Sequence, residues 1–230
     1  MSVPARTGRS RMPRLADYKA VVFDMDGTLT PNMHLHEEAF TIFRDKYTIA
    51  TPDEATIASL SGKRNSEIFP VLFGRPLSDE ELLAYADEKE TLYRTLMHHV
   101  HPVKGLHAFL KHMDAHGLGS AIATSAPHGN VGPTLERLQL PAYFGAITLG
   151  SEVKHGKPAP DIFIEAARRL GHAPQHCIGI EDSFAGLQSV RDSGMYTVAI
   201  ATTHTASELA AAKPDVIVHD YEELMRHFAL

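Results

Sequence analysis

Two acidic residues spaced two apart follow a short apolar run near the start of the chain. The run 20–23 is rich in valine, and Asp24, Asp26 and Gly27 come directly after it. Such a run is typical of a strand buried on both faces, and open α/β sheets bind ligands at the carboxyl ends of their strands. Because the chain turns at Gly27, we expect Asp26 to lie over Asp24. The alternative interpretation is an acidic turn without chemistry.

A second acidic pair follows another apolar run. Glu181 and Asp182 come after residues 177–180 and precede a run of small residues that is typical of a helix start. Burying two carboxylates together is unfavourable unless a cation or a proton compensates. Mg²⁺ prefers oxygen ligands and is the usual cation beside phosphate, so the pair predicts a magnesium site. The alternative is a helix cap, since acids favour helix N-termini.

Hydroxyl groups and a lysine complete the candidate constellation. The run 120–124 ends in Thr124, which Ser125 follows, and such hydroxyls can donate to a phosphate oxygen. Lys157 precedes Pro158, which restricts it to an extended backbone just ahead of a predicted helix. Alone, either motif is equally compatible with an ordinary strand end or a surface turn.

Strand-like and helix-like segments alternate through most of the chain. This alternation predicts right-handed crossovers and a parallel sheet, hence an α/β, Rossmann-like core of about six strands. The predicted strands are 20–24, 120–124, 146–149, 177–181, 196–200 and 216–218, with helices at 130–139, 159–170, 184–193 and 206–212.

Residues 31–100 carry helical patterns only. Thr51 is the expected N-cap of one helix, and Ser78 that of a long helix reaching about Met97. We therefore predict a discontinuous core, 17–30 and 101–230, with a helical-bundle cap inserted at 31–100. The long helix is expected to bury an apolar stripe made of Leu82, Leu83, Ala86, Leu92 and Leu96.

Composition bounds the function classes. The 230 residues carry a net charge of −6 and one cysteine, Cys177, which we expect to be a buried, inert thiol. The charge argues against a nucleic-acid partner, and no apolar stretch is long enough to span a membrane. A single cysteine fits a reducing cytoplasm. Residues 1–16 have four arginines and no acid, which predicts a disordered tail, with a targeting peptide as the alternative.

The order of the motifs carries more information than any one of them. D-x-D-G-T, then Thr124, then G-K-P-A-P-D and finally I-E-D-S-F-A-G resembles the four-motif order of the haloacid dehalogenase superfamily of phosphotransferases. The helical insertion after the first motif, and the K-P-A-P-D and E-D-S-x-x-G forms, look like its β-phosphoglucomutase and small sugar-phosphate phosphatase branch.

This resemblance implies a role for each acid. Asp24 is the expected nucleophile that forms an aspartyl-phosphate, and Asp26 the expected general acid and then base. The implied Mg²⁺ ligands are Asp24, the backbone carbonyl of Asp26, and Asp182. Glu181 either binds the ion directly or holds a metal-bound water. Thr124 and Lys157, with the backbone N–H of Ser125, are expected to hold the phosphate oxygens.

The cap loop bears on the choice between phosphatase and phosphomutase. β-Phosphoglucomutases carry K-G-V-S-R there, whereas this chain places Ser61 and Asn65 at the lysine and arginine positions. We therefore expect a phosphatase of a small phosphorylated metabolite, namely a sugar, a polyol or a small acid, and keep a phosphomutase as the alternative. Lys63, Arg64, Asn65 and His36 are the candidate substrate contacts in the cap.

Two remoter alternatives remain. An inactive binding module would be expected to lack one of the four core residues, all of which are present. A dehalogenase is disfavoured because Asp26 and the second acidic pair suit phosphate chemistry. We expect a monomer or a weak dimer.

Overall fold

A single parallel sheet forms the centre of the molecule. A computed structural model describes residues 13–230, and its six strands run in the order β3-β2-β1-β4-β5-β6. All five neighbouring pairs are parallel. The α/β, Rossmann-like prediction is thereby confirmed. The strands are β1 (Ala20–Phe23), β2 (Gly119–Thr124), β3 (Ala146–Leu149), β4 (Cys177–Glu181), β5 (Tyr196–Ile200) and β6 (Val216–Val218).

Strand β1 is buried on both faces, as its continuous apolar run requires. Val21 and Phe23 belong to the cluster that α5 and α10 cover, while Ala20 and Val22 pack with side chains of α7 and α8. Successive side chains thus supply two separate layers of core. The helices that cover the sheet, in chain order, are α5 (Leu106–Ala115), α6 (His128–Arg137), α7 (Asp161–Arg169), α8 (Phe184–Ser193), α9 (Ala206–Leu209) and α10 (Tyr221–His227).

The strand order reverses at β1. This strand pairs with β2 on one side and with β4 on the other, because β2 and β3 are added on one side of it and the later strands on the other. In open parallel sheets a crevice forms at the carboxyl ends of the strands at such a switch point. The three motif-bearing strands therefore end side by side.

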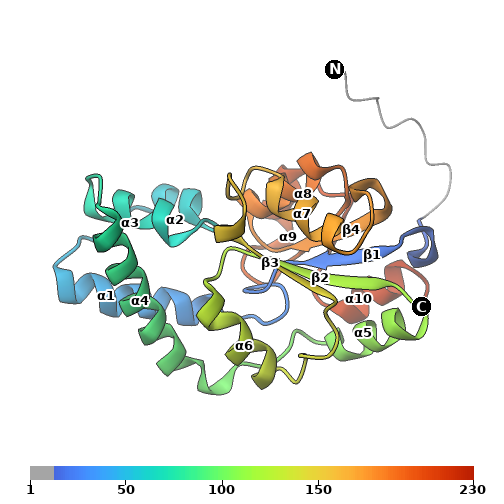
Figure 1. Ribbon diagram of the computed structural model, residues 1–230. Coiled ribbons are helices and arrows are strands. Elements are labelled where there is room, and N and C mark those ends of the chain that lie inside the picture. Colours follow the sequence, from blue (N-terminus) through green and yellow to red (C-terminus); the bar gives the residue numbers. More distant parts are fainter. Residues whose placement is uncertain (1–12) are drawn as a thin grey trace.

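Four helices lie together beside the sheet (Figure 1). They are α1 (Met33–Tyr47), α2 (Glu54–Leu60), α3 (Asn65–Phe73) and α4 (Asp79–Leu96). We propose that this helical block is the cap, in line with the predicted division of the chain. The Ser78 side chain caps α4, as expected. The predicted N-cap residue of α2, Thr51, is wrong. The N-cap is Asp53, whose carboxylate accepts the Thr56 N–H.

The predicted apolar stripe of α4 is confirmed at Leu92 and Leu96, which pack against a buried cluster, but is wrong at Leu83, which is 73% exposed. The buried residues of the helix are Lys89, Glu90 and Tyr93. Buried charges that pair with each other resemble a solvated helix face in sequence, which hides the true inner face.

The prediction of a disordered tail over residues 1–16 is wrong at its C-terminal end. Leu15 is 2% exposed and opens a short 3₁₀ helix, Leu15–Asp17, that packs on the core. Residues 1–12 of that prediction lie outside the described part of the chain. From residue 13 onward, the structure contains no helix with the length and apolar character needed to cross a membrane.

Candidate active site

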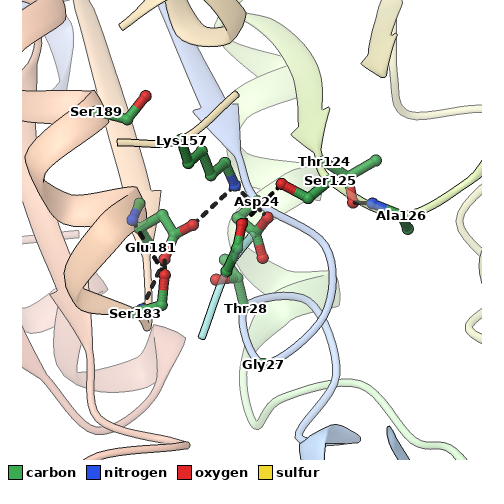
Figure 2. Close-up of polar contacts among 12 residues, drawn as sticks. Asp24, Gly27, Thr28, Thr124, Ser125, Ala126, Lys157, Glu181, Ser183 and Ser189 are labelled. Carbon is green, nitrogen blue, oxygen red and sulfur yellow. Dashed lines mark hydrogen bonds and ion pairs between the residues drawn. The ribbon is translucent and has the colours of Figure 1, made fainter. Parts of the chain in front are cut away.

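Lys157 lies between two carboxylates at the end of the sheet. Its Nζ donates to Asp24 Oδ1 at 2.6 Å and to Glu181 Oε1 at 2.8 Å (Figure 2). All three side chains are buried, and Lys157 is only 1% exposed. Burial opposes the charge of Lys157, but the two carboxylates together raise its pKa. The ammonium group therefore fixes one oxygen of Asp24 and leaves the other, Oδ2, for chemistry.

Three buried acids converge beside this lysine. Asp24, Glu181 and Asp182 offer carboxylate oxygens that lie within 4.8 Å of one another. Burial raises the pKa of Asp24 to about 7, against the opposing charge of Lys157. Burial, reinforced by the other two acids, also raises the pKa of Asp182 well above its ordinary value. One lysine does not balance three carboxylates, and the all-oxygen donor set fits a hard divalent cation.

The two acids of the second pair have different surroundings. Glu181 Oε1 accepts from Lys157, and Oε2 accepts from the Ser183 N–H at 2.7 Å and its hydroxyl at 2.9 Å. Among the described residues, the Asp182 carboxylate accepts from the hydroxyls of Thr28 and Thr203 alone. Glu181 is thus committed to protein donors on both oxygens, while Asp182 retains free acceptor capacity.

Gly27 allows the turn to pass close to Asp182. Its φ is +86°, and a Cβ built there would lie 2.0 Å from Asp182 Oδ2. Both the backbone angle and the lack of space require glycine. The turn residue of the first motif therefore serves the second acidic pair.

Asp26 is held by a chain of polar groups from the cap. The Asn32 amide donates to its Oδ1 at 2.6 Å, and His36 Nε2 lies 3.5 Å from the same oxygen without hydrogen-bond alignment. Lys89 Nζ is 2.8 Å from His36 Nδ1. Because an ammonium group only donates, Nδ1 accepts and the proton of the neutral ring is on Nε2, facing Asp26. Burial alone would raise the pKa of Asp26. The contacts with His36 and Asn32 and the charge of Lys89 outweigh burial, so the pKa of Asp26 lies below its ordinary value.

Glu90 joins the cap to the core. Its Oε1 accepts from Lys89 at 3.0 Å and from the Asn65 amide at 2.7 Å, and its Oε2 accepts from the Asn130 amide at 2.7 Å. These partners come from α4, α3 and α6, so one buried carboxylate connects three helices. Lys89 and Glu90 were not predicted as site residues. The only sequence signal, adjacent opposite charges on a helix, occurs on many solvated surfaces.

Some of the predicted phosphate-binding and cap residues bond within the protein, and others face the cavity. Thr124 ends β2 and is 1% exposed, and its Oγ1 accepts the Ala126 N–H. The Ser125 hydroxyl donates to the Gly62 carbonyl at 2.8 Å, which ties the cap loop to the core. Lys63 faces the cavity between the two parts of the molecule.

Arg64 does not face that cavity, contrary to its prediction as a substrate contact. Its guanidinium binds Glu67 at 2.9 Å and the Gly150 carbonyl at 3.2 Å. Asn65 reaches the cavity with its amide engaged by Glu90. The short loop therefore closes the cap onto the core with Arg64 and leaves Lys63 as its cation toward a ligand.

The cavity has a volume of about 470 Å³ and extends from the core into the cap. Asp24, Asp26, Glu181, Asp182 and Thr124 line its inner end. Side chains of α1, α2 and α3 line its outer end. The acids, the hydroxyl and the cap thus share one cavity of the size of a small-molecule site.

Comparison with known proteins gives one consistent family. A family model described as haloacid dehalogenase-like hydrolase matches residues 21–200. Fructose-1-phosphate phosphatase YqaB of Escherichia coli (strain K12) is 32% identical over 188 residues, covering 79% of this chain and 95% of the relative. Hexitol phosphatase A of the same organism is 28% identical over 209 residues, covering 90% of this chain and 93% of the relative.

Solved structures agree with this result. A family IA, variant 3 hydrolase from Entamoeba histolytica HM-1:IMSS superposes with a TM-score of 0.82 at 28% identity, covering 92% of this chain and 98% of the other. β-Phosphoglucomutase from Clostridium difficile gives a TM-score of 0.80 at 25% identity, covering 92% and 97%. The same superfamily thus accounts for the sequence matches and the fold.

Proposed function

The chain belongs to the haloacid dehalogenase-like hydrolase family, and we propose that it is a Mg²⁺-dependent phosphatase of small phosphorylated carbohydrates. The proposed substrates extend to polyol phosphates and small-acid phosphates. The proposed reaction passes through an aspartyl-phosphate. The observation that carries the proposal is the convergence of Asp24, Lys157, Glu181 and Asp182 on one buried point. The names of the relatives, which are sugar and hexitol phosphatases, support the reaction class.

In the first step Asp24 Oδ2 attacks phosphorus. The substrate's phosphate dianion opposes ionisation of the neighbouring Asp26, which therefore takes up a proton on Oδ2 while its Oδ1 accepts from Asn32. A bond forms between Asp24 Oδ2 and phosphorus, the bond from phosphorus to the ester oxygen breaks, and Asp26 gives that proton to the leaving oxygen. In the second step water attacks the aspartyl-phosphate, Asp26 takes a proton from it, and Asp24 is released with inorganic phosphate. Asn32 and His36 hold the Asp26 carboxylate at the position from which both transfers occur.

The residues present fit a magnesium ion. Asp24 and Asp182 would hold it, together with the Asp26 carbonyl that the family resemblance implies. Bound there, the ion supplies positive charge that lets a carboxylate approach a phosphate dianion. We propose that Glu181 acts instead by orienting Lys157, because both of its oxygens already accept from protein groups.

The transferring phosphoryl group needs donors for its non-bridging oxygens. Lys157 is placed to provide one, and the Thr124 hydroxyl and the Ser125 N–H lie at the end of the adjacent strand. Because these groups are fixed before substrate binds, little reorganisation opposes the reaction.

The test is a phosphate-release assay with fructose 1-phosphate and a hexitol phosphate. We expect turnover with Mg²⁺, its loss with excess EDTA, and recovery when Mg²⁺ is added back. Turnover that survives EDTA unchanged would refute the metal assignment. An absence of phosphate release from a broad panel of esters would refute the phosphatase.

A phosphomutase is the second candidate, supported by the likeness to β-phosphoglucomutase. Against it, Asn65 and Arg64 are engaged within the protein and do not offer a fixed cation for a far phosphate. Conversion of β-glucose 1-phosphate to the 6-phosphate with a bisphosphate primer distinguishes the two.

A further inference from the structure

The cap side of the active-site cavity is walled by apolar side chains. Met33 and Phe40 of α1, Ile57 and Leu60 of α2, and Ile68 and Leu72 of α3 all line it. The pairs on α1 and α3 are spaced seven and four apart, so each pair lies on one face of its helix. Three helices therefore turn apolar faces toward a space that continues from Asp24.

Packing of the cap explains only part of this wall. The ring centre of Phe40 lies 6.1 Å from that of Phe69, which belongs to the aromatic cluster of the cap around Phe43 and Tyr85. Ile57, by contrast, is 44% exposed although it lines the cavity, so folding gains little from its side chain. An apolar surface left open beside a catalytic centre is typical of a ligand site.

The residues that line the cavity along α1 change in character away from the core. His36 Nε2 lies 3.5 Å from Asp26 Oδ1, Phe40 is four residues or about 6 Å beyond His36, and Arg44 is about 12 Å beyond it. Lys89 Nζ lies 2.8 Å from His36 Nδ1, and Lys63 follows Gly62, whose carbonyl accepts from Ser125, so both lysines line the cavity on the side of the core. A ligand whose phosphate is bound at Asp24 therefore extends outward past polar groups, then past Phe40, and then reaches Arg44.

Arg44 has donors to spare at the far end. Its guanidinium contacts the Thr41 hydroxyl at 3.1 Å, and no carboxylate of the described residues forms an ion pair with it. Glu37 and Thr41, exposed on the same helix, also line the cavity. Arg44 and Thr41 can donate to the carbonyl groups of an uncharged heteroaromatic ring, and Glu37 can accept from its N–H groups. A second phosphate fits this end of the cavity less well, because the Glu37 carboxylate would repel it.

We propose that the substrate is a sugar or polyol phosphate that carries an uncharged heteroaromatic ring, the chemistry of a nucleoside monophosphate or a flavin mononucleotide. This inference rests on the proposed phosphatase function and narrows its substrate class. The phosphate binds at Asp24 and the hydroxyl-bearing carbons lie beside His36 and Lys63. The ring packs on Phe40, Ile57 and Leu72.

The experiment compares esters that differ only by the ring. Phosphate release with Mg²⁺ is measured for ribose 5-phosphate against uridine 5′-monophosphate, and for ribitol 5-phosphate against flavin mononucleotide. We expect kcat/KM to be at least about tenfold higher for the ring-bearing member of one pair, as apolar pockets of this kind discriminate. Equal or higher values for both ring-free esters would overturn the proposal.

Ile57→Ser tests the wall, and Ile42→Ser is its matched control. Ile42 is 41% exposed, close to the 44% of Ile57, but it lies on α1 away from the cavity. We expect Ile57→Ser to lower the ratio of kcat/KM between the ring-bearing and ring-free esters by about threefold or more, mainly through KM. The control should leave that ratio unchanged, and an equal effect of the two variants would contradict the inference.

Two further outcomes separate the possible failures. If neither these four esters nor fructose 1-phosphate nor any ester of the broad panel releases phosphate with Mg²⁺, the phosphatase itself is refuted; if fructose 1-phosphate is hydrolysed and these four are not, only the inference fails. If ribose 5-phosphate is hydrolysed but the ring gives no gain, only the inference fails. A preference for fructose 1,6-bisphosphate over fructose 1-phosphate that Arg44→Gln removes would show that the outer end binds a second anion, which also overturns the proposal.

Discussion

Replacing Lys89 by methionine tests the polar chain between the cap and Asp26. Lys89 is 2% exposed, donates to Glu90 at 3.0 Å and lies 2.8 Å from His36 Nδ1. Methionine keeps an unbranched apolar stem but removes the charge and all three donors. The variant therefore leaves one carboxylate and one ring nitrogen in the interior without their cation.

The cost in stability follows from the carboxylate. Removing one partner of a buried ion pair costs about 3–5 kcal/mol, since the other charge stays buried. Glu90 keeps the amides of Asn65 and Asn130, and burial lowers the pKa of Lys89, so the native lysine also carries a desolvation penalty. We therefore expect a loss near the lower end, about 3 kcal/mol, in the free energy of unfolding by urea. The double variant Lys89→Met, Glu90→Gln should recover part of it.

The effect on catalysis depends on the leaving group. Without Lys89, His36 is free to exchange the proton between its nitrogens, and the N–H facing Asp26 is no longer fixed. General acid catalysis contributes about 100-fold or more, so we expect a kcat loss of that order for a sugar phosphate. p-Nitrophenolate leaves without a proton, so p-nitrophenyl phosphate should lose far less.

Two results would refute this reasoning. A destabilisation below about 1 kcal/mol would show that the buried pair is not coupled as its geometry indicates. Equal losses for the sugar phosphate and for p-nitrophenyl phosphate would show that Lys89 acts on the fold or on binding, and not through Asp26. The exposed pair of Lys46 and Glu88 is the control, and Lys46→Met should cost well under the buried substitution.

Three further predictions concern the core. Asp24→Asn should abolish phosphate release while leaving the circular dichroism spectrum unchanged; wild-type turnover would place the nucleophile elsewhere. Gly27→Ala should raise the Mg²⁺ concentration needed for half-maximal activity, because its Cβ would displace Asp182; an unchanged requirement would contradict that contact. Burial raises the pKa of Cys177 to about 11, so at pH 8 only about one thiol in a thousand is ionised. A thiol reagent should label it only after unfolding, and rapid labelling of the native protein would refute its burial.

The core was predictable because its sequence signals are local. A strand buried on both faces is a continuous apolar run, and all six strands begin and end within one residue of the predicted positions, with β3 to β6 identical. Parallel pairing then brings the carboxyl ends of β1, β2 and β4 to one edge. The residues that follow these runs must therefore meet, whatever connects them.

The cap was less predictable because its important contacts are pairwise. Leu83 matched an apolar stripe yet is exposed, while Lys89 and Glu90 are buried only because they neutralise each other. Arg64 matched a ligand-binding loop, but Glu67 and a core carbonyl take its guanidinium. A charge in a sequence does not reveal its partner, so burial of charged residues follows only from the assembled fold.

The role of Glu181 can be decided by a single substitution. Glu181 accepts from Lys157 on one oxygen and from Ser183 on the other. Glutamine has one oxygen acceptor and one NH₂ donor, so in Glu181→Gln the NH₂ group must face either Lys157 or the donors of Ser183. The lost hydrogen bond should cost about 1–3 kcal/mol in the free energy of unfolding. If Glu181 orients Lys157, kcat falls while the Mg²⁺ concentration for half-maximal activity stays nearly constant. If Glu181 binds the ion directly, that concentration rises about tenfold or more, as for the loss of a metal ligand or its support.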